Sequence, residues 1–191
     1  MRRGEHGGDW AAYQIQYHGM PLDFSANVSP MGIPAGVKRA LYQAVEEVNR
    51  YPDPLCRQLR ACLGRHHDVS SAQILCGNGA SDLIDRLVLA LRPKRGMVTA
   101  PAFSEYGQAL RRVGCQVEEF PLQRAEDFRM TARILERITP ALDILFLCEP
   151  SNPAGQTTDR ALLEKILERC DACGCLLYTS PSPRDGLLSR M

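Results

Sequence analysis

The stretch "DILFLCEPSNPAG", residues 143–155, joins an apolar run to a polar turn flanked by prolines. Residues 144–148 are apolar at every position, so both faces of a strand here would be buried, as in the centre of a parallel sheet. Directly after the turn, the pattern over residues 159–173 predicts a helix. The stretch therefore predicts one strand–turn–helix unit of an α/β fold, with the turn at the carboxyl end of the strand.

The same alternation extends outward along the chain. Apolar residues at helical spacing, including Val37, Leu41 and Val48, predict a helix that begins near Pro34 and ends before Pro52. Alternating strands and helices predict a three-layer α/β/α fold around a mainly parallel sheet. Further strands are expected at residues 73–76, 96–101 and 115–120, with another beginning at Cys175, and further helices at residues 55–63, 81–91, 103–114 and 130–138.

The composition is that of a globular protein. With 45% hydrophobic and 24% charged residues and a net charge of +1, nothing favours nucleic acid or a membrane surface as a partner. No apolar run reaches the ~18 residues of a membrane helix. Arg2 and Arg3 are not followed by an apolar run, so we expect no secretory signal and a cytoplasmic protein.

The chain contains eight cysteines, which we expect to be reduced in the cytoplasm. Cys170, Cys173 and Cys175 form a CxxCxC pattern that leaves a zinc site as an alternative. A structural zinc ion takes four Cys or His ligands, and His66 and His67 are distant in sequence. We therefore expect the first two of these cysteines to end a helix and the third to begin a strand, with no metal.

Two glycine-containing turns are expected at the carboxyl edge of the sheet, where parallel sheets bind ligands. One is "GNGAS", residues 77–81, which leads into a helix capped by Ser81 or Asp82, and the other is "EPSNPAG", residues 149–155. The N–H groups of a helix N-terminus bind phosphate, although glycines also simply form turns. The first turn lacks both GxGxxG and the Lys-Ser/Thr ending of a P-loop, which disfavours a nucleotide-binding domain.

Six motifs in order resemble the pyridoxal 5'-phosphate (PLP) enzymes of the class I/II aminotransferase superfamily. The resemblance runs from about His6 to about Leu177 and is most similar to two branches, threonine-phosphate decarboxylase and histidinol-phosphate aminotransferase. It implies the PLP-transferase large domain and a small phosphorylated amino-acid substrate. The motifs are "HGG" at 6–8, "LDFSANVSPMGIP" at 22–34, "RYPDP" at 50–54, "GNGASDLI" at 77–84, "PAFSEYG" at 101–107 and "LCEPSNPAG" at 147–155.

The resemblance implies a role for each residue of the cofactor site. Asn152 would donate to the phenolic oxygen of PLP, where the alternative is an Asn that caps a turn. Phe103 would stack on the pyridine ring, where the alternative is core packing. Backbone amides would hold the cofactor phosphate, contributed by Gly79, Ala80 and Ser81.

The N-terminal motifs imply the substrate and the partner. "HGG" is similar to the decarboxylase branch, in which His6, Gly7 and Asn27 would hold the substrate. Tyr51 would reach the cofactor phosphate of a second subunit, which implies a homodimer; a tyrosine packed in a turn is the alternative. We expect decarboxylation of L-threonine O-3-phosphate to (R)-1-aminopropan-2-yl phosphate in cobalamin biosynthesis, with a histidinol-phosphate-type aminotransferase as the alternative.

The chain departs from the family pattern in its lysines. The family attaches PLP to a lysine as a Schiff base, and Lys38, Lys94 and Lys165 all lie outside the Ser-x-x-Lys setting that the family uses. An aspartate is expected near position 180, which is Ser180 here. We therefore expect no catalytic lysine and an inactive chain, with a non-catalytic PLP-binding or dimerising fragment as a further alternative.

The last residues also depart from the pattern. "YTSPSPRD", residues 178–185, places Pro181 and Pro183 where a central strand is expected. It is similar to translated adaptor or vector sequence, and a natural short paralogue with a divergent tail is the alternative. We expect an N-terminal arm at 1–30, a partial PLP-binding large domain at 31–178 that lacks its last strands and the small domain, and a foreign or disordered tail at 179–191.

Overall fold

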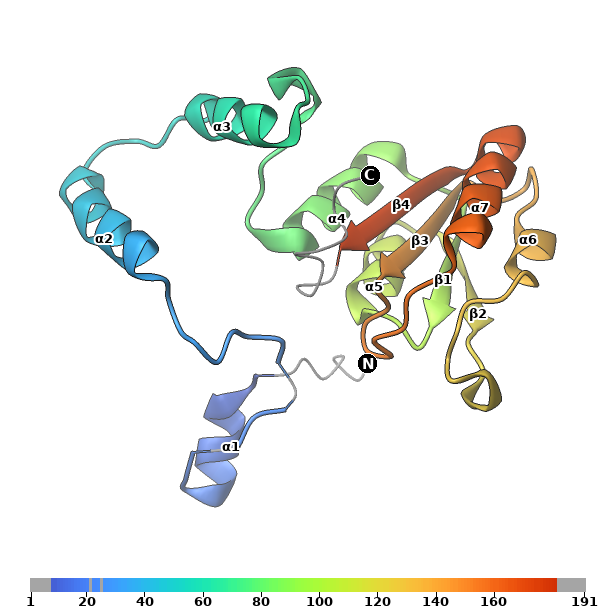
Figure 1. Cartoon of the computed structure of the whole chain (residues 1–191), viewed down its shortest axis with the longest axis horizontal. Coiled ribbons are helices and arrows are strands. Elements are labelled where there is room, and N and C mark those ends of the chain that lie inside the picture. Colours follow the sequence, from blue (N-terminus) through green and yellow to red (C-terminus); the bar gives the residue numbers. More distant parts are fainter. Residues whose placement is uncertain (1–7, 21, 25, 182–191) are drawn as a thin grey trace. The chain divides into compact units, whose positions relative to one another are not determined.

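The computed structural model describes residues 8–20, 22–24 and 26–181 (Figure 1). It divides into two compact units, residues 1–76 and residues 77–191. The division falls after Cys76, whereas the arm was expected to end at residue 30. Within the described residues, no helix is long and apolar enough to cross a membrane.

The second unit contains a four-stranded parallel sheet with the strand order β2-β1-β3-β4. The register places Gly96 of β1 beside Ile144 of β3, and Ile144 beside Leu176 of β4. β3 is buried from Ile144 to Cys148, as its apolar sequence predicts. The strands are β1 at Arg95–Ala100, β2 at Gln116–Pro121, β3 at Ile144–Glu149 and β4 at Leu176–Pro181.

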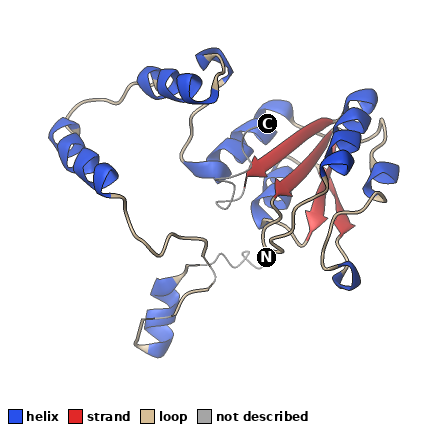
Figure 2. Ribbon diagram, in the orientation of Figure 1, coloured by secondary structure: helices blue, strands red, loops and turns tan. Residues whose placement is uncertain are grey.

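Helices cover both faces of this sheet (Figure 2). On one face, Val98 and Phe146 belong to a core cluster with residues of α4, Gly79–Leu91, and α5, Ser104–Arg112. On the other face, Met97, Leu145 and Leu147 belong to a cluster with residues of α6, Ile134–Arg137, and α7, Arg160–Cys173. The alternation of neighbouring strand residues between two cores confirms the predicted three-layer α/β/α architecture.

The first unit is helical and buries little of its apolar surface. Its helices are α1 at Trp10–Tyr17, α2 at Ala35–Ala44 and α3 at Arg57–His67, with short 3₁₀ helices at Val45–Glu47 and Ser71–Gln73. Among its described residues only Gly64 is buried. The predicted apolar stripe runs along α2 and into the 3₁₀ helix that follows it, but Val37, Leu41 and Val45 are about half exposed.

Some predicted elements are wrong in kind or extent. Residues 73–76 are not a strand, because no strand of the described residues pairs with them. The helix expected over 130–138 is reduced to α6, since the bonds that precede it, such as Ile134 N–H to Thr131 C=O at 3.2 Å, span three residues rather than four. β4 continues through Pro181, three residues past the expected end of the domain at 178. A proline is tolerated as the last residue of a strand at the sheet edge.

Candidate cofactor site

The carboxyl ends of β1 and β3 lie at the same edge of the sheet because the two strands are parallel and in register. Phe103 follows the last residue of β1 by three positions, and Asn152 follows the last residue of β3 by three positions. The fold therefore carries both predicted site residues to one edge, as the sequence predicts for loops that follow neighbouring parallel strands.

The turn that carries Asn152 is closed by its own backbone. The N–H of Ser151 donates to the carbonyl of Gln156 at 2.7 Å, and the N–H of Gly155 donates to the carbonyl of Ser151 at 2.6 Å. Gly155 has φ +70°, a left-handed conformation that favours glycine. Asn152 is half-buried in this turn, and the peptide bond to Pro153 is cis.

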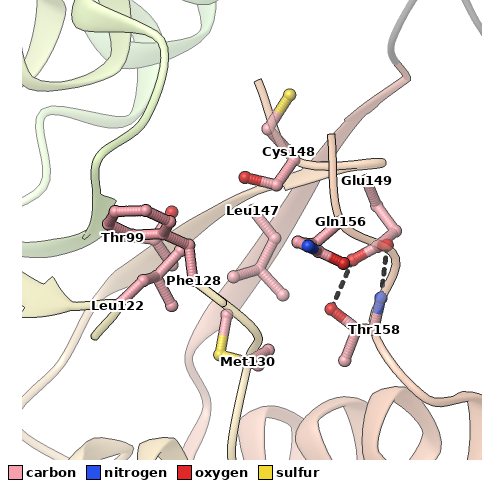
Figure 3. A pocket seen from close by; sticks show the side chains of 10 residues that line it. Thr99, Leu122, Phe128, Met130, Leu147, Cys148, Glu149, Gln156 and Thr158 are labelled. Carbon is pink, nitrogen blue, oxygen red and sulfur yellow. Dashed lines mark hydrogen bonds between the residues drawn. The ribbon is translucent and has the colours of Figure 1, made fainter. Parts of the chain in front are cut away.

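Glu149, the last residue of β3, is a site residue that sequence reasoning missed. Its carboxylate accepts one hydrogen bond from the N–H of Thr158 at 2.7 Å and another from the Thr158 hydroxyl at 2.6 Å (Figure 3). The two residues bracket the eight positions between them. They also line a small cavity of about 10 Å³, roughly the room for one water molecule. Its other walls include Thr99, Leu147 and Gln156.

The N-terminus of α4 forms an open cradle of backbone amides. Asp82 accepts a 2.9 Å hydrogen bond from the N–H of Asn78, which occupies the N-cap position. The helix therefore begins at Gly79, two residues before Ser81 and three before Asp82, the two expected caps. No acceptor for the N–H groups of Gly79, Ala80 or Ser81 is present among the described residues. Gly79 has φ +81°, and nothing lies within 4 Å of where its Cβ would be. This end of the helix offers donors and a positive dipole to an anion.

Phe103 is half-buried, and its ring packs edge-on against Tyr106 with the ring centroids 5.6 Å apart. Tyr106 in turn stacks on Phe146 of β3 at 5.0 Å. The core packing that was the alternative for Phe103 is therefore present. A ring supported from the core in this way can still present its other side to a ligand.

The cysteines of the CxxCxC pattern lie where the sequence predicts. Cys170 and Cys173 are in the last turns of α7, and Cys175 directly precedes β4. A hydrogen bond between the thiols of Cys170 and Cys175 lowers the pKa of Cys170 and raises that of Cys175. In the part of the chain that the structure describes, no group of three or more His, Cys, Asp or Glu side chains is arranged to hold a metal ion.

Comparison with known proteins decides the family. Residues 20–179 match the profile of the family "Aminotransferase class I and II". The chain belongs to this family. The chain is 45% identical over 149 residues to threonine-phosphate decarboxylase of Salmonella typhimurium, covering 78% of this chain and 41% of the relative. It is 32% identical over 150 residues to histidinol-phosphate aminotransferase of Bacillus velezensis, with the same two coverages of 78% and 41%.

A solved structure shows the same fold. The crystal structure of L-threonine-O-3-phosphate decarboxylase from Porphyromonas gingivalis superposes with a TM-score of 0.70 at 22% identity, over 84% of this chain and 46% of that one. The chain thus spans less than half the length of the relatives that it matches.

Class I/II aminotransferases and threonine-phosphate decarboxylases depend on pyridoxal 5'-phosphate. The residues of the sheet edge fit this cofactor. The amides of Gly79, Ala80 and Ser81 suit a phosphate, and open space surrounds the Cβ position of Gly79. Gly77, just before these amides, packs closely against the first turn of α4. A Cβ at this position would lie 2.6 Å from Asp82 Oδ2 and 2.7 Å from Leu83 Cδ2.

The three lysines of the chain are divided between the two units. Lys94 precedes β1, at the opposite end of that strand, and its backbone N–H donates to Asp143 at 2.6 Å. Lys165 is exposed on α7 and Lys38 is exposed on α2. Ser180, at the position where the family pattern has an aspartate, lies in β4 beside Cys148.

The predicted residues of the first unit are exposed or outside the described residues. Tyr51 is fully exposed, and Asn27 is exposed. His6 and Gly7 lie outside the described residues. The turn that follows Tyr51 is organised by Asp53, which accepts from the N–H of Arg57 at 2.7 Å and the N–H of Leu55 at 3.1 Å. These backbone bonds, that of Arg57 first, lower the pKa of the Asp53 carboxyl.

Proposed function

We propose that this chain forms the cofactor-binding part of a PLP-dependent enzyme that decarboxylates L-threonine O-3-phosphate to (R)-1-aminopropan-2-yl phosphate in cobalamin biosynthesis. One observation carries the choice of reaction. Over spans of almost equal length, the chain is 45% identical to a threonine-phosphate decarboxylase and 32% identical to a histidinol-phosphate aminotransferase. The difference favours the decarboxylase, because both comparisons cover the same share of this chain.

The roles of the edge residues follow from their chemistry. The amides of Gly79, Ala80 and Ser81 hold the phosphate of PLP by hydrogen bonds and the positive end of the α4 dipole. Asn152 donates its side-chain amide to the phenolic oxygen of the ring, and Phe103 packs on the ring face. When bound, PLP supplies an electron sink for the bond that breaks at Cα of the substrate.

The first unit supplies the substrate and partner contacts in this proposal. His6, Gly7 and Asn27 bind the phosphorylated amino acid. The full exposure of Tyr51 supports a role in a second subunit's site, because the side chain is available to a partner. The active enzyme is accordingly a homodimer with shared sites.

Two other functions are supported by specific observations. The 32% identity to histidinol-phosphate aminotransferase supports transamination of that substrate. The settings of the lysines support a non-catalytic chain that binds PLP or pairs with a longer homologue. Lys94 precedes β1, at the end of that strand opposite the carboxyl edge, and Lys38 and Lys165 are exposed on α2 and α7. In that case PLP binds this chain without a covalent bond.

The test has two arms. First, the source DNA is read through the codons for Gly174 to Met191, and the longest encoded protein is assayed for CO₂ release from L-threonine O-3-phosphate and for glutamate formation from histidinol phosphate and 2-oxoglutarate. CO₂ release without glutamate formation supports the proposal, and the reverse supports the aminotransferase. Second, the 191-residue chain is titrated with PLP. The non-catalytic function is supported if the chain binds PLP saturably, if Asn152→Ala weakens that binding, and if the chain shows neither CO₂ release nor glutamate formation.

A further inference from the structure

The turn that carries Asn152 is held at its base by side chains as well as by its own backbone. Both oxygens of the Glu149 carboxylate are engaged by one residue, Thr158, through its N–H at 2.7 Å and its hydroxyl at 2.6 Å. Figure 3 shows these two bonds side by side among the residues that line the small cavity at the end of β3. The strand end and the residue that leaves the turn are thereby tied together.

The turn is closed by two sets of hydrogen bonds, an inner set within its backbone and an outer set between Glu149 and Thr158. Inside the turn, the N–H of Ser151 donates to the carbonyl of Gln156, and the N–H of Gly155 donates to the carbonyl of Ser151. Outside it, Glu149 and Thr158 close the segment 150–157. A bond to an ionised acceptor is about twice as strong as one between neutral groups, so the outer tie is the stronger restraint on the position of the turn.

The tie is made in a setting where a carboxylate is costly unless it is fully satisfied. Glu149 and Thr158 are both half-buried, and the cavity that they line has apolar walls from Leu147, Leu122 and Met130. An apolar side chain of similar size would fill the same space without desolvating a charge. The stability of the core therefore does not account for a glutamate at this position, whereas the position of the turn does.

We propose that Glu149 is a positioning residue, which through Thr158 fixes the turn that presents Asn152 to the cofactor. The role of Asn152 in this proposal rests on the proposed function. The hydrogen bonds between Glu149 and Thr158 are observed independently of it. Glu149 itself lies behind the turn and acts through Thr158 and the backbone of residues 150–157.

The test uses the 191-residue chain and variants that separate positioning from packing. Glu149→Met removes both acceptors at similar volume, and Thr158→Val removes only the hydroxyl donor. Thr158→Ser restores that donor. Thr157→Val is the matched control, because Thr157 is the exposed neighbour of Thr158. Two readouts are taken: amide hydrogen exchange of Ser151, Gly155 and Thr158 without cofactor, and the affinity for PLP.

We expect Glu149→Met and Thr158→Val to raise exchange at these amides by roughly tenfold and to weaken PLP binding by a similar factor. The amides of β3 and the melting temperature should change little, and Thr158→Ser and Thr157→Val should match the parent chain. Unchanged exchange, or faster exchange with unchanged PLP affinity, overturns the proposal. If the parent chain binds no PLP while the exchange results are as expected, the proposed function fails, and the role of Glu149 and Thr158 in fixing the turn still stands.

Discussion

The backbone N–H of Asn78 donates a 2.9 Å hydrogen bond to the carboxylate of Asp82, four residues further along the chain. Asn78 itself makes no side-chain cap. The carboxylate of Asp82 thus reaches back over the first turn of α4 and accepts from one of the N–H groups that a helix start leaves unsatisfied. The N–H groups of Gly79, Ala80 and Ser81 are not engaged by it. The same carboxylate also pairs with Arg86 at 3.8 Å.

Replacement of Asp82 should loosen the start of α4. We expect Asp82→Ala to lower the free energy of unfolding by about 1 kcal/mol, the usual effect of losing a helix cap. Asp82→Asn keeps an acceptor oxygen and should lose less. Urea denaturation followed by circular dichroism measures both. Asp171→Ala, an exposed acidic residue near the end of α7, is the control and should change stability by less than about 0.5 kcal/mol.

Gly77 is expected to tolerate no side chain. A Cβ at this position would lie 2.6 Å from Asp82 Oδ2 and 2.7 Å from Leu83 Cδ2, so Gly77→Ala must displace the cap and the first turn of α4. We expect a loss of about 1–3 kcal/mol in unfolding free energy, as for other overpacked sites, together with weaker PLP binding.

The control for this change is the same substitution in open space. Nothing lies within 4 Å of the Cβ position of Gly36, in α2, so Gly36→Ala should stabilise the chain by about 0.4–1 kcal/mol. Equal melting temperatures for the two alanine variants would contradict the packing argument at Gly77.

The fold was predictable where local pattern and burial agree. The all-apolar run of β3 fixed a central strand, and its alternating contacts with two cores confirm it. The strand expected at residues 73–76 was wrong because a strand needs a partner, which a local pattern cannot supply. The length of α6 was not predictable either, since nothing in "MTARILERI" distinguishes the residues that form α6 from the 3₁₀-like turn that precedes this helix.

The candidate site was predictable only in part. Spacing after the strands placed Phe103 and Asn152 at one edge, because parallel strands end together. The tie between Glu149 and Thr158 was not predictable, since the two residues, with eight positions between them, meet only when the turn closes. A glutamate directly before a proline-rich turn, followed by a threonine after it, is the one signal in the sequence that could have suggested the pair.

Phe103 should contribute to cofactor affinity more than to stability. Phe103→Leu keeps an apolar side chain against Tyr106 but removes the ring face, so we expect the Kd for PLP to rise about 5–10-fold, the usual range for a lost aromatic contact. Phe120→Leu is the control, because Phe120 is buried in the core between the sheet and α6 and α7. It should lower stability and leave the Kd unchanged. Fluorescence titration with PLP measures both Kd values. An unchanged Kd for Phe103→Leu would show that the Phe103 ring serves only in core packing.

Cys115 should make the chain less stable in alkali. Burial raises the pKa of its thiol above the usual 9.0, and the Asp143 carboxylate raises it further. The folded chain therefore retains a proton that the unfolded chain releases, so the stability contributed by the neutral thiol is complete below the unfolded pKa and is lost as the pH rises through the folded one. We expect the urea midpoint to fall as the pH rises above the usual thiol pKa of 9.0, and Cys115→Ala to make this fall shallower.

Alkylation tests the burial of Cys115 independently. Iodoacetamide at about pH 8.5 should label the exposed Cys62 at once and Cys115 only after urea is added. Equal labelling of both thiols without urea would show that the core around Cys115 is open in solution.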